Sequence, residues 1–179
     1  MQGKKKGLTH IYTGDGKGKT TAAIGLGIRA VGHDMKVLMA QFLKGRHTGE
    51  LEALKKLGNN FLVIRHKEIK KFTCDMTEDE INELKTEVVA LFKRVINEAD
   101  TGNWDMIILD EIMASVSLGF ISSGKLLQFI KSKPECLELV LTGREAGAEL
   151  IAAADYVSEI KMVKHPMQMG INARSGVEF

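Results

Sequence analysis

The sequence predicts an α/β protein with a mostly parallel sheet and helices on both faces, in a single domain that spans residues 1–179. Short stretches of strand length alternate with longer stretches of helical periodicity. The strand-like stretches are apolar at nearly every position, which is typical of strands covered on both faces. The 179 residues suffice for one domain with a sizeable core and include no repeat, low-complexity segment or linker.

The N-terminal part of the chain contains three expected strands and two expected helices. A strand over 8–13 ends in glycines, and a helix over 20–31 follows it and stops at a glycine. The run KVLMAQF over 36–42 predicts a buried strand. A short helix over 50–57, ended by another glycine, precedes a third strand over 61–65.

The longest helical pattern, over 77–99, has the clearest start signal. Thr77 and Glu80 have the spacing of a capping box, in which each side chain satisfies the backbone N–H of the other residue. Apolar residues then recur every three or four positions, so one face is buried. A fourth strand follows over 106–109, and a helix over 126–130 ends before a proline. The chain continues with a strand over 137–141, a helix over 145–153 and a strand over 156–160.

Composition narrows the class of protein. Hydrophobic residues make up 44% of the chain, yet no apolar run reaches the roughly 18–20 residues that span a bilayer, so we expect no membrane partner. The basic segment Lys4-Lys5-Lys6 is not followed by the apolar stretch of a signal peptide, which predicts a cytoplasmic protein. The net charge of +2 is small and the charges are interspersed, so we expect no nucleic-acid partner. Cys74 and Cys136 match no metal-binding spacing and are expected to be reduced thiols.

The strongest functional signal is the glycine-rich segment 14–21 between the first strand and the first helix. It matches the phosphate-binding pattern G-x-x-x-x-G-K-[ST], except that Thr13 stands where the first glycine is usual. Glycines let backbone N–H groups approach phosphate oxygens, the helix N-terminus adds partial positive charge, and Lys19 adds a full charge. We therefore predict a P-loop NTPase-like (RecA-like) fold that binds the triphosphate of ATP or a close relative. The expected ATP contacts in the loop are Gly14, Asp15, Gly16, Lys17, Gly18, Lys19, Thr20 and Thr21, with a solvated side chain as the alternative for Lys17.

Acidic residues at the end of a later strand predict the metal site. The apolar strand over 106–109 runs into Asp110 and Glu111, the form of a Walker B element. We expect Asp110 to lie beside the phosphate loop and to hold Mg²⁺ directly or through water, with the Thr20 hydroxyl as a second ligand. In a hydrolase, Glu111 would activate water. The candidate catalytic residues are Lys19, Thr20 and Glu111.

Two arginines are further candidates for ATP contacts. Arg144 follows a strand end, where a guanidinium can reach a phosphate or a ribose. Arg29 lies on the helix after the phosphate loop, with a solvated helix face as its alternative.

Nearly the entire chain, from about Gly7 to Phe179, resembles the P-loop type of ATP:corrinoid adenosyltransferases, which act on cob(I)alamin or cob(I)yrinic acid a,c-diamide. The segment 12–23 is similar to that family's signature, including Thr13, although most members have Asn where Asp15 stands. The C-terminal block is the most distinctive part of the resemblance. Matching blocks are Gln41-Phe42-Leu43-Lys44-Gly45 with Gly49-Glu50-Leu51, Leu109-Asp110-Glu111-Ile112, Leu141-Thr142-Gly143-Arg144, Lys164-His165-Pro166, Gly170-Ile171, Ala173 and Gly176-Val177-Glu178-Phe179.

The resemblance implies a reaction in which Co(I) of a reduced corrinoid attacks the 5′-carbon of ATP and triphosphate leaves, in adenosylcobalamin biosynthesis or salvage. Co(I) carries no proton, so the reaction needs no general base, and Glu111 would then help to bind Mg²⁺. Because the 5′-carbon must be the open end of the nucleotide, we expect the triphosphate to lie in the loop with reversed polarity. The resemblance also implies a homodimer and an electron-donating reductase as a partner.

An apolar pocket for the corrinoid is a further implication of the resemblance. Phe42, Phe72 and Met113 are our candidates for its wall, with ordinary core packing as the alternative for each. The family commonly has an aromatic residue after a Phe-Thr pair near the middle of the chain, whereas here Phe72-Thr73 is followed by Cys74. This part of the wall therefore differs from the family pattern.

Two other functions are compatible with the nucleotide motifs alone. A P-loop ATPase or small-molecule kinase would use Glu111 to position water or a hydroxyl, and it would form ADP. A regulatory module would bind ATP tightly without turning it over. The products separate these functions, because only adenosyl transfer yields triphosphate and requires a reduced corrinoid.

Overall fold

The computed structural model describes residues 6–44, 47–67 and 73–178. Its strands are β1 (Thr9–Thr13), β2 (Val37–Gln41), β3 (Phe61–Arg65), β4 (Met106–Asp110), β5 (Glu138–Thr142) and β6 (Tyr156–Glu159). They form one six-stranded sheet in the order β3-β2-β4-β5-β1-β6. Every neighbouring pair of strands is parallel, so the predicted parallel sheet is confirmed.

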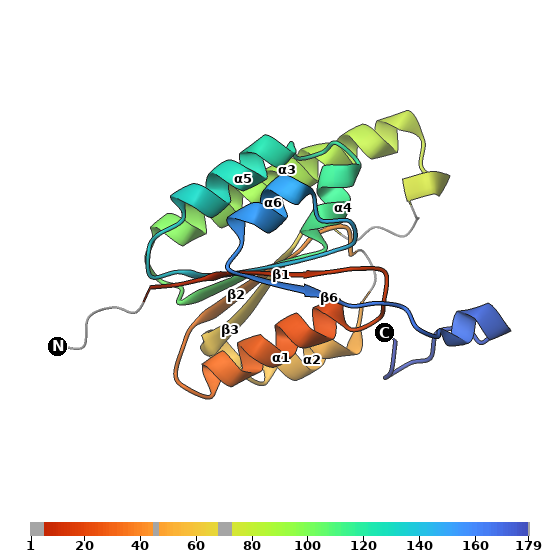
Figure 1. Cartoon of the computed structure of the whole chain (residues 1–179), viewed down its shortest axis with the longest axis horizontal. Helices are drawn as coiled ribbons and strands as arrows, with labels where there is room; N and C mark the ends of the chain where they lie inside the picture. The colour runs from red at the N-terminus through yellow and green to blue at the C-terminus, as the bar shows by residue number, and fades with distance from the viewer. Residues whose placement is uncertain (1–5, 45–46, 68–72, 179) are drawn as a thin grey trace.

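Helices cover both faces of this sheet (Figure 1). On one face lie α1 (Lys19–Val31) and α2 (Gly49–Lys55). On the other face lie α3 (Glu78–Asp100), α4 (Ile112–Ser117), α5 (Ser123–Ser132) and α6 (Ala148–Ala153). Single 3₁₀ turns occur at Gly58–Asn60, Thr73–Asp75 and Pro166–Met169. The described part of the chain contains no helix long and apolar enough to cross a membrane.

The start signal of α3 is confirmed in detail. The Glu80 N–H donates to the Thr77 hydroxyl over 3.3 Å, and the Thr77 N–H donates to the Glu80 carboxylate over 2.8 Å. This capping box satisfies two of the N–H groups that a helix start leaves without a partner.

Two helices differ from the sequence prediction. The short helix α4 was not predicted, because it follows β4 after a single residue and its first turn has no side-chain cap. The helix expected over 145–153 begins only at Ala148, since Glu145 has φ 56° and cannot be part of a helix.

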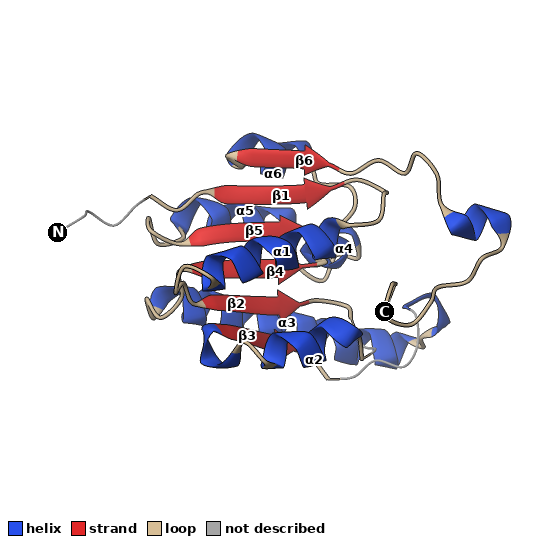
Figure 2. Ribbon diagram, turned by 90° about the horizontal axis from the view of Figure 1, so that it is seen from below, coloured by secondary structure: helices blue, strands red, loops and turns tan. Residues whose placement is uncertain are grey.

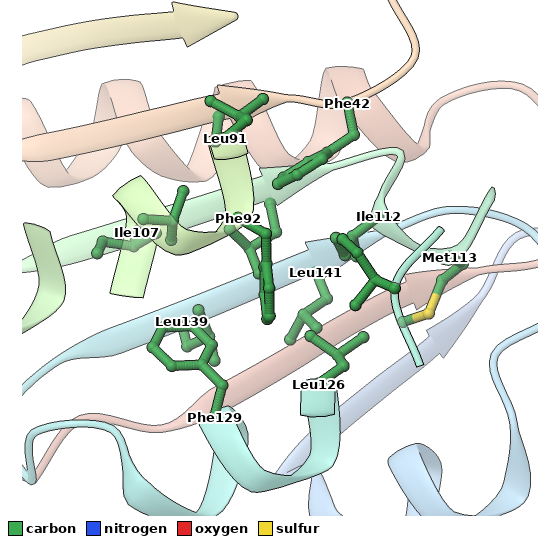
Figure 3. Packing of buried hydrophobic residues seen from close by; sticks show 14 of the residues in the cluster. Phe42, Leu91, Phe92, Ile107, Ile112, Met113, Leu126, Phe129, Leu139 and Leu141 are labelled. Atoms are coloured by element: carbon green, nitrogen blue, oxygen red, sulfur yellow. The ribbon is translucent and has the colours of Figure 1, made fainter. Parts of the chain in front are cut away.

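The core is divided between the two faces of the sheet. On the side of α3 and α5, the rings of Phe92 and Phe129 meet edge to face with centroids 5.9 Å apart (Figure 3). On the side of α1, Ala23 packs in a second cluster that includes Met39 and Ile108. Every residue of β2 and β4 is buried, as the continuous apolar runs predicted.

Strand β6 lies at one edge of the sheet and is the exception to this burial. All four of its residues are exposed. After β6 the chain leaves the sheet and runs beyond the carboxyl ends of the strands (Figure 2). Because all strands are parallel, the loops that follow β1, β2, β4 and β5 meet at this same edge, where ligands bind in such folds.

Candidate active site

The phosphate loop connects β1 to α1 at the carboxyl edge of the sheet. Gly18 directly precedes α1 and has φ 123°, a conformation that L side chains rarely adopt. A Cβ atom added at Gly18 would meet no atom within 4 Å, so the loop is open at this point. Open space at a helix N-terminus lets an anion approach the backbone N–H groups. The loop therefore has a geometry suited to phosphate at Gly18.

Two other loop glycines are explained by the chain that follows β6. An added Cβ would lie 2.5 Å from the Ile160 carbonyl oxygen at Gly14, and 2.7 Å from the same oxygen at Gly16. The Gly16 N–H donates to that carbonyl over 2.8 Å, and the Met162 N–H donates to the Asp15 carboxylate over 3.1 Å. These glycines therefore permit close packing of the segment after β6 on the phosphate loop.

Thr13, which stands where a glycine is usual, has a use for its side chain. The residue is 7% exposed, and its hydroxyl oxygen accepts a hydrogen bond from the Ala146 N–H over 3.2 Å. A glycine could not make this bond. The Thr13 hydroxyl thus ties the start of the phosphate loop to the loop after β5, which carries Arg144.

The Lys19 side chain folds back onto the loop. Its ammonium donates to the Gly14 carbonyl over 2.6 Å and to the Gly16 carbonyl over 2.8 Å. Burial lowers the pKa of Lys19, the nearby Glu111 carboxylate opposes this shift, and the Arg144 guanidinium adds to it. Both charges therefore lie within electrostatic reach of Lys19. A bound triphosphate would offer this ammonium charged acceptors in place of neutral carbonyls.

Asp110 is the centre of the site. It lies at the end of β4 and its side chain is completely buried. The Thr20 hydroxyl donates to Oδ1 of Asp110 over 2.9 Å, so Asp110 lies beside the phosphate loop. The Thr142 hydroxyl donates to the same oxygen over 2.7 Å and accepts the Glu111 N–H over 2.9 Å. Since β5 separates β4 from β1 in the sheet, Thr142 at the end of β5 fixes Asp110 from the neighbouring strand.

A second cation at the site was not singled out from the sequence. Lys44 follows β2, and its Nζ lies 2.7 Å from Oδ2 of Asp110 and 2.9 Å from the Thr20 hydroxyl oxygen. The Gln41 side-chain amide donates to Oδ2 of Asp110 over 3.4 Å. Its Oε1 is buried and has no hydrogen-bond partner among the described residues. The Asp110 carboxylate is thus neutralised by an ion pair and held by three further polar groups, as a buried charge requires.

Glu111 occupies a strained position next to Asp110. Its φ of 63° is in the left-handed region, where a residue with a side chain costs about 1–2 kcal/mol. The hydrogen bond from its N–H to the Thr142 hydroxyl holds it there. The close packing of α4 against Gly143 also holds it, since a Cβ added at Gly143 would lie 2.6 Å from Cβ of Met113 in α4. Strain that the surrounding structure maintains is typical of functional sites.

Lys17 forms an ion pair within the protein, and its predicted phosphate contact stays a prediction. Its ammonium donates to the Glu178 carboxylate over 3.0 Å and to the Val177 carbonyl over 3.2 Å. Arg174 also binds this carboxylate, and the two cations hold the pKa of Glu178 at about 2, mainly through Arg174. The C-terminal segment is thus tied to the phosphate loop at a second point.

The remaining predicted site residues that the structure describes are Arg29, Phe42, Met113 and Thr21. Arg29 lies in the last turn of α1, about 15 Å along the helix axis from Lys19. Phe42 and Met113 are 0% and 1% exposed and belong to the core in this structure, so a corrinoid contact would require them to become exposed. Phe72 lies outside the described residues. Thr21 is exposed in the first turn of α1. The ATP and corrinoid assignments of these residues stay predictions.

An apolar groove of about 340 Å³ lies elsewhere on the molecule. It runs between α3 and α5, where Phe92, Phe120 and Phe129 contribute to its lining. None of its lining residues belongs to the phosphate loop or to the network around Asp110. The chemistry of the site therefore lies outside this groove.

Comparison with known proteins identifies the family to which this site belongs. The sequence profile of the family described as "ATP:corrinoid adenosyltransferase BtuR/CobO/CobP" matches residues 5–179. The chain belongs to this family. A corrinoid adenosyltransferase of a Sinorhizobium species is 37% identical over 180 residues, which cover 98% of this chain and 81% of the relative. The corrinoid adenosyltransferases of Escherichia coli K12 and Pseudomonas aeruginosa are each 33% identical over 177 residues, covering 98% of this chain and 87% and 85% of the relatives.

Membership of the ATP:corrinoid adenosyltransferase family confirms the resemblance seen in the sequence motifs. It makes the chain a transferase whose substrates are ATP and a corrinoid. Sequence reasoning identified the loop, Thr20 and Asp110, but it assigned no role to Gln41, Lys44 or Thr142. All three lie in sequence blocks that carry the family resemblance. Gln41 and Thr142 end strands and Lys44 follows one, so all three lie at the carboxyl edge of the sheet. This position at strand ends could have identified them from the sequence.

Proposed function

We propose that this chain transfers the 5′-deoxyadenosyl group of ATP to the Co(I) centre of a reduced corrinoid, with release of triphosphate. The observation that carries the proposal is the arrangement of Lys19, Thr20 and Asp110 at the open phosphate loop of an ATP:corrinoid adenosyltransferase family member. Co(I) supplies the electron pair of the new cobalt–carbon bond. The bond between the 5′-carbon and its oxygen breaks, and triphosphate departs with the electron pair of that broken bond, so no proton has to be moved.

The site fits Mg²⁺, which prefers oxygen ligands. The Thr20 hydroxyl and the Asp110 carboxylate lie 2.9 Å apart, and the Lys44 ammonium, a cation, sits within 2.9 Å of both. The unpartnered Oε1 of Gln41 is a buried acceptor beside the same carboxylate, suited to a water of the ion's hydration shell. When bound, Mg²⁺ would supply positive charge to the leaving triphosphate. We expect Glu111, the residue after Asp110, to help hold the ion.

The protein's own groups would bind and stabilise the leaving triphosphate. The open approach at Gly18 and the N-terminus of α1 offer N–H donors. At about 4 Å and an effective dielectric constant near 20, the Lys19 charge is worth roughly 4 kcal/mol to a phosphate before desolvation. Arg144 adds a second full charge in the same region. Because negative charge grows on the triphosphate as the carbon–oxygen bond breaks, these groups favour the transition state over bound ATP.

The proposal requires reversed polarity of the nucleotide in the loop. The 5′-carbon has to face the corrinoid, and the γ-phosphate has to point away from it. A crystal structure with a non-reactive ATP analogue and Mg²⁺ tests this orientation. A γ-phosphate directed at the corrinoid would contradict the proposal and favour a hydrolase or kinase, in which Glu111 would act on water or a hydroxyl.

The finer assignments follow from the same proposal. We treat residues 1–179 as one catalytic domain that works in the cytoplasm as a homodimer and receives its reduced corrinoid through an electron-donating reductase, in adenosylcobalamin biosynthesis or salvage. Phe42, Phe72 and Met113 remain the proposed apolar wall of the corrinoid pocket. Since Phe42 and Met113 are buried, the wall would form only after a rearrangement near the ends of β2 and β4.

One anaerobic assay tests the proposed function directly. The protein is mixed with ATP, Mg²⁺ and chemically reduced cobalamin, and the absorption spectrum is followed for conversion of cob(I)alamin into an alkylated product. We expect conversion that depends on both ATP and protein. Folded protein that produces no adenosylated corrinoid would refute the proposal. Formation of ADP without corrinoid would favour the ATPase reading, and tight ATP binding without turnover would favour a regulatory module.

A further inference from the structure

The Lys44 ammonium occupies the position between the two oxygen groups proposed as metal ligands. Its Nζ lies 2.7 Å from Oδ2 of Asp110 and 2.9 Å from the Thr20 hydroxyl oxygen. An ammonium and a divalent cation cannot share this position, because both need the same oxygens and their charges repel. Metal binding at Thr20 and Asp110 therefore requires the Lys44 side chain to move away.

The surroundings of Asp110 explain why a cation is needed there before a metal arrives. The Asp110 side chain has no exposed surface, and the neighbours that bind it, Gln41, Thr20 and Thr142, are neutral. Hydrogen bonds from neutral groups only partly offset the cost of a buried carboxylate. Among the described residues, Lys44 is the cation that forms an ion pair with Asp110.

The attachment of Lys44 allows its side chain to leave without unfolding the site. Its backbone is anchored, since the Arg65 guanidinium donates to its carbonyl oxygen. The side chain itself is 25% exposed, and the flexible four-carbon stem of a lysine can swing while the backbone stays in place. The ammonium is already in contact with Thr20, so phosphates bound in the adjoining loop would lie within its reach.

We propose that Lys44 is a placeholder cation: it neutralises Asp110 in the nucleotide-free protein, excludes free divalent cations, and yields the position only when metal and triphosphate arrive together. A free divalent cation would have to displace the Lys44 ammonium, and the displaced ammonium would gain no new anionic partner. The metal–ATP complex brings its own phosphate oxygens, which give the displaced ammonium an anionic partner. Metal binding is thereby made dependent on the nucleotide. The inference rests on the proposed metal site of the proposed function.

The test is a titration with Mn²⁺ alone, without nucleotide, in which the electron paramagnetic resonance signal of free Mn²⁺ reports binding. We compare the wild type with Lys44→Met and with Lys55→Met, a matched control that removes an exposed lysine ion-paired to Glu52. The wild type and the control should bind Mn²⁺ weakly. Lys44→Met should bind one Mn²⁺ roughly tenfold tighter or more, because a positive charge next to the metal position is gone. Equal Mn²⁺ affinity in all three proteins would overturn the proposal.

Two further variants identify the site and guard against misfolding. The double variant Lys44→Met, Asp110→Asn should lose the gained Mn²⁺ binding, and retention of that binding would refute the assignment. Where Lys44→Met does not fold, Lys44→Gln takes its place, since its amide can still donate to Asp110 but carries no charge. A thermal unfolding scan gives an independent readout: Mg²⁺ alone should raise the melting temperature of the Lys44 variant but not of the wild type. A shift of the same size in the wild type would contradict the inference.

None of these measurements involves adenosyl transfer. If the Mn²⁺ titration gives the expected result but the cobalamin assay shows no adenosyl transfer, the role proposed for Lys44 stands and the proposed reaction is refuted. If the protein transfers the adenosyl group but Lys44 has no effect on Mn²⁺ binding, the proposed reaction stands and the role proposed for Lys44 is refuted.

Discussion

Replacing Thr142 by valine tests how the Asp110 network is held together. Thr142 is completely buried, and its hydroxyl makes two hydrogen bonds, to the Asp110 carboxylate at 2.7 Å and from the Glu111 N–H at 2.9 Å. Valine has nearly the same shape, so no cavity is created. Loss of a hydrogen bond to a charged group costs about 1.5–3 kcal/mol, and a buried N–H left without a partner costs about 1–3 kcal/mol. We expect Thr142→Val to lower the free energy of unfolding by about 3 kcal/mol.

Urea unfolding measures this loss of unfolding free energy. The slope of the unfolding free energy against urea concentration should be unchanged, which would show that only stability has changed. For a chain of this size, a loss of about 3 kcal/mol corresponds to a melting temperature lower by roughly 6–12 °C. Thr142→Ser is the matched control, since it keeps the hydroxyl and should recover most of the stability. A loss below about 1 kcal/mol in the valine variant would refute the view that the Thr142 hydroxyl holds Asp110 and Glu111 in place.

Four further substitutions or titrations follow from the structure. Lys19→Met should lower kcat/KM for adenosyl transfer by about 10²–10³-fold, measured in the anaerobic assay, because it removes charge from the leaving-group site. Gly25→Ala, at an exposed position of α1 with open space around it, should raise the free energy of unfolding by about 0.5–1 kcal/mol. Gly27→Ala, two residues further, places a Cβ 2.6 Å from an aromatic ring and should lower that free energy by about 1–3 kcal/mol. Arg174 holds the pKa of Glu178 at about 2, below its ordinary value of 4.5. The ion pair should therefore stabilise the C-terminal segment fully above pH 4.5, and this stabilisation should be lost as the pH falls toward 2. NMR titration of the Glu178 carboxyl group would follow the loss. Equal effects at the two glycines, or a Glu178 midpoint near 4.5, would contradict these expectations.

The fold was predictable where local signals and burial agree. Strands β2 and β4 are apolar up to their last residues, Gln41 and Asp110, because helices cover both of their faces, and α3 carries its own start signal at Thr77 and Glu80. The sequence contains no such start signal for the short helix α4. Its start is determined by its packing against Gly143 and by the strained conformation of Glu111. Its position is a tertiary effect that periodicity over six residues cannot reveal.

The site was predictable where its functional residues are neighbours within a short sequence motif. The loop 14–21 and the acidic end of β4 were found because their residue types and spacing are specific. Lys44 and Thr142 were not, because each contributes through a contact with Asp110 that depends on the order of strands in the sheet. The glycines at 14 and 16 were attributed to phosphate binding, whereas the structure also requires them for packing against Ile160. That contact comes from a segment about 145 residues away in the sequence, beyond any local pattern.

The central claim is that the phosphate loop holds a leaving group, and the identity of the phosphate product tests it most directly. Phosphorus NMR of the anaerobic reaction with ATP, Mg²⁺ and cob(I)alamin distinguishes triphosphate from ADP and orthophosphate. We predict intact triphosphate in equal amount to the adenosylated corrinoid. ADP and orthophosphate formed without adenosylated corrinoid would contradict the claim.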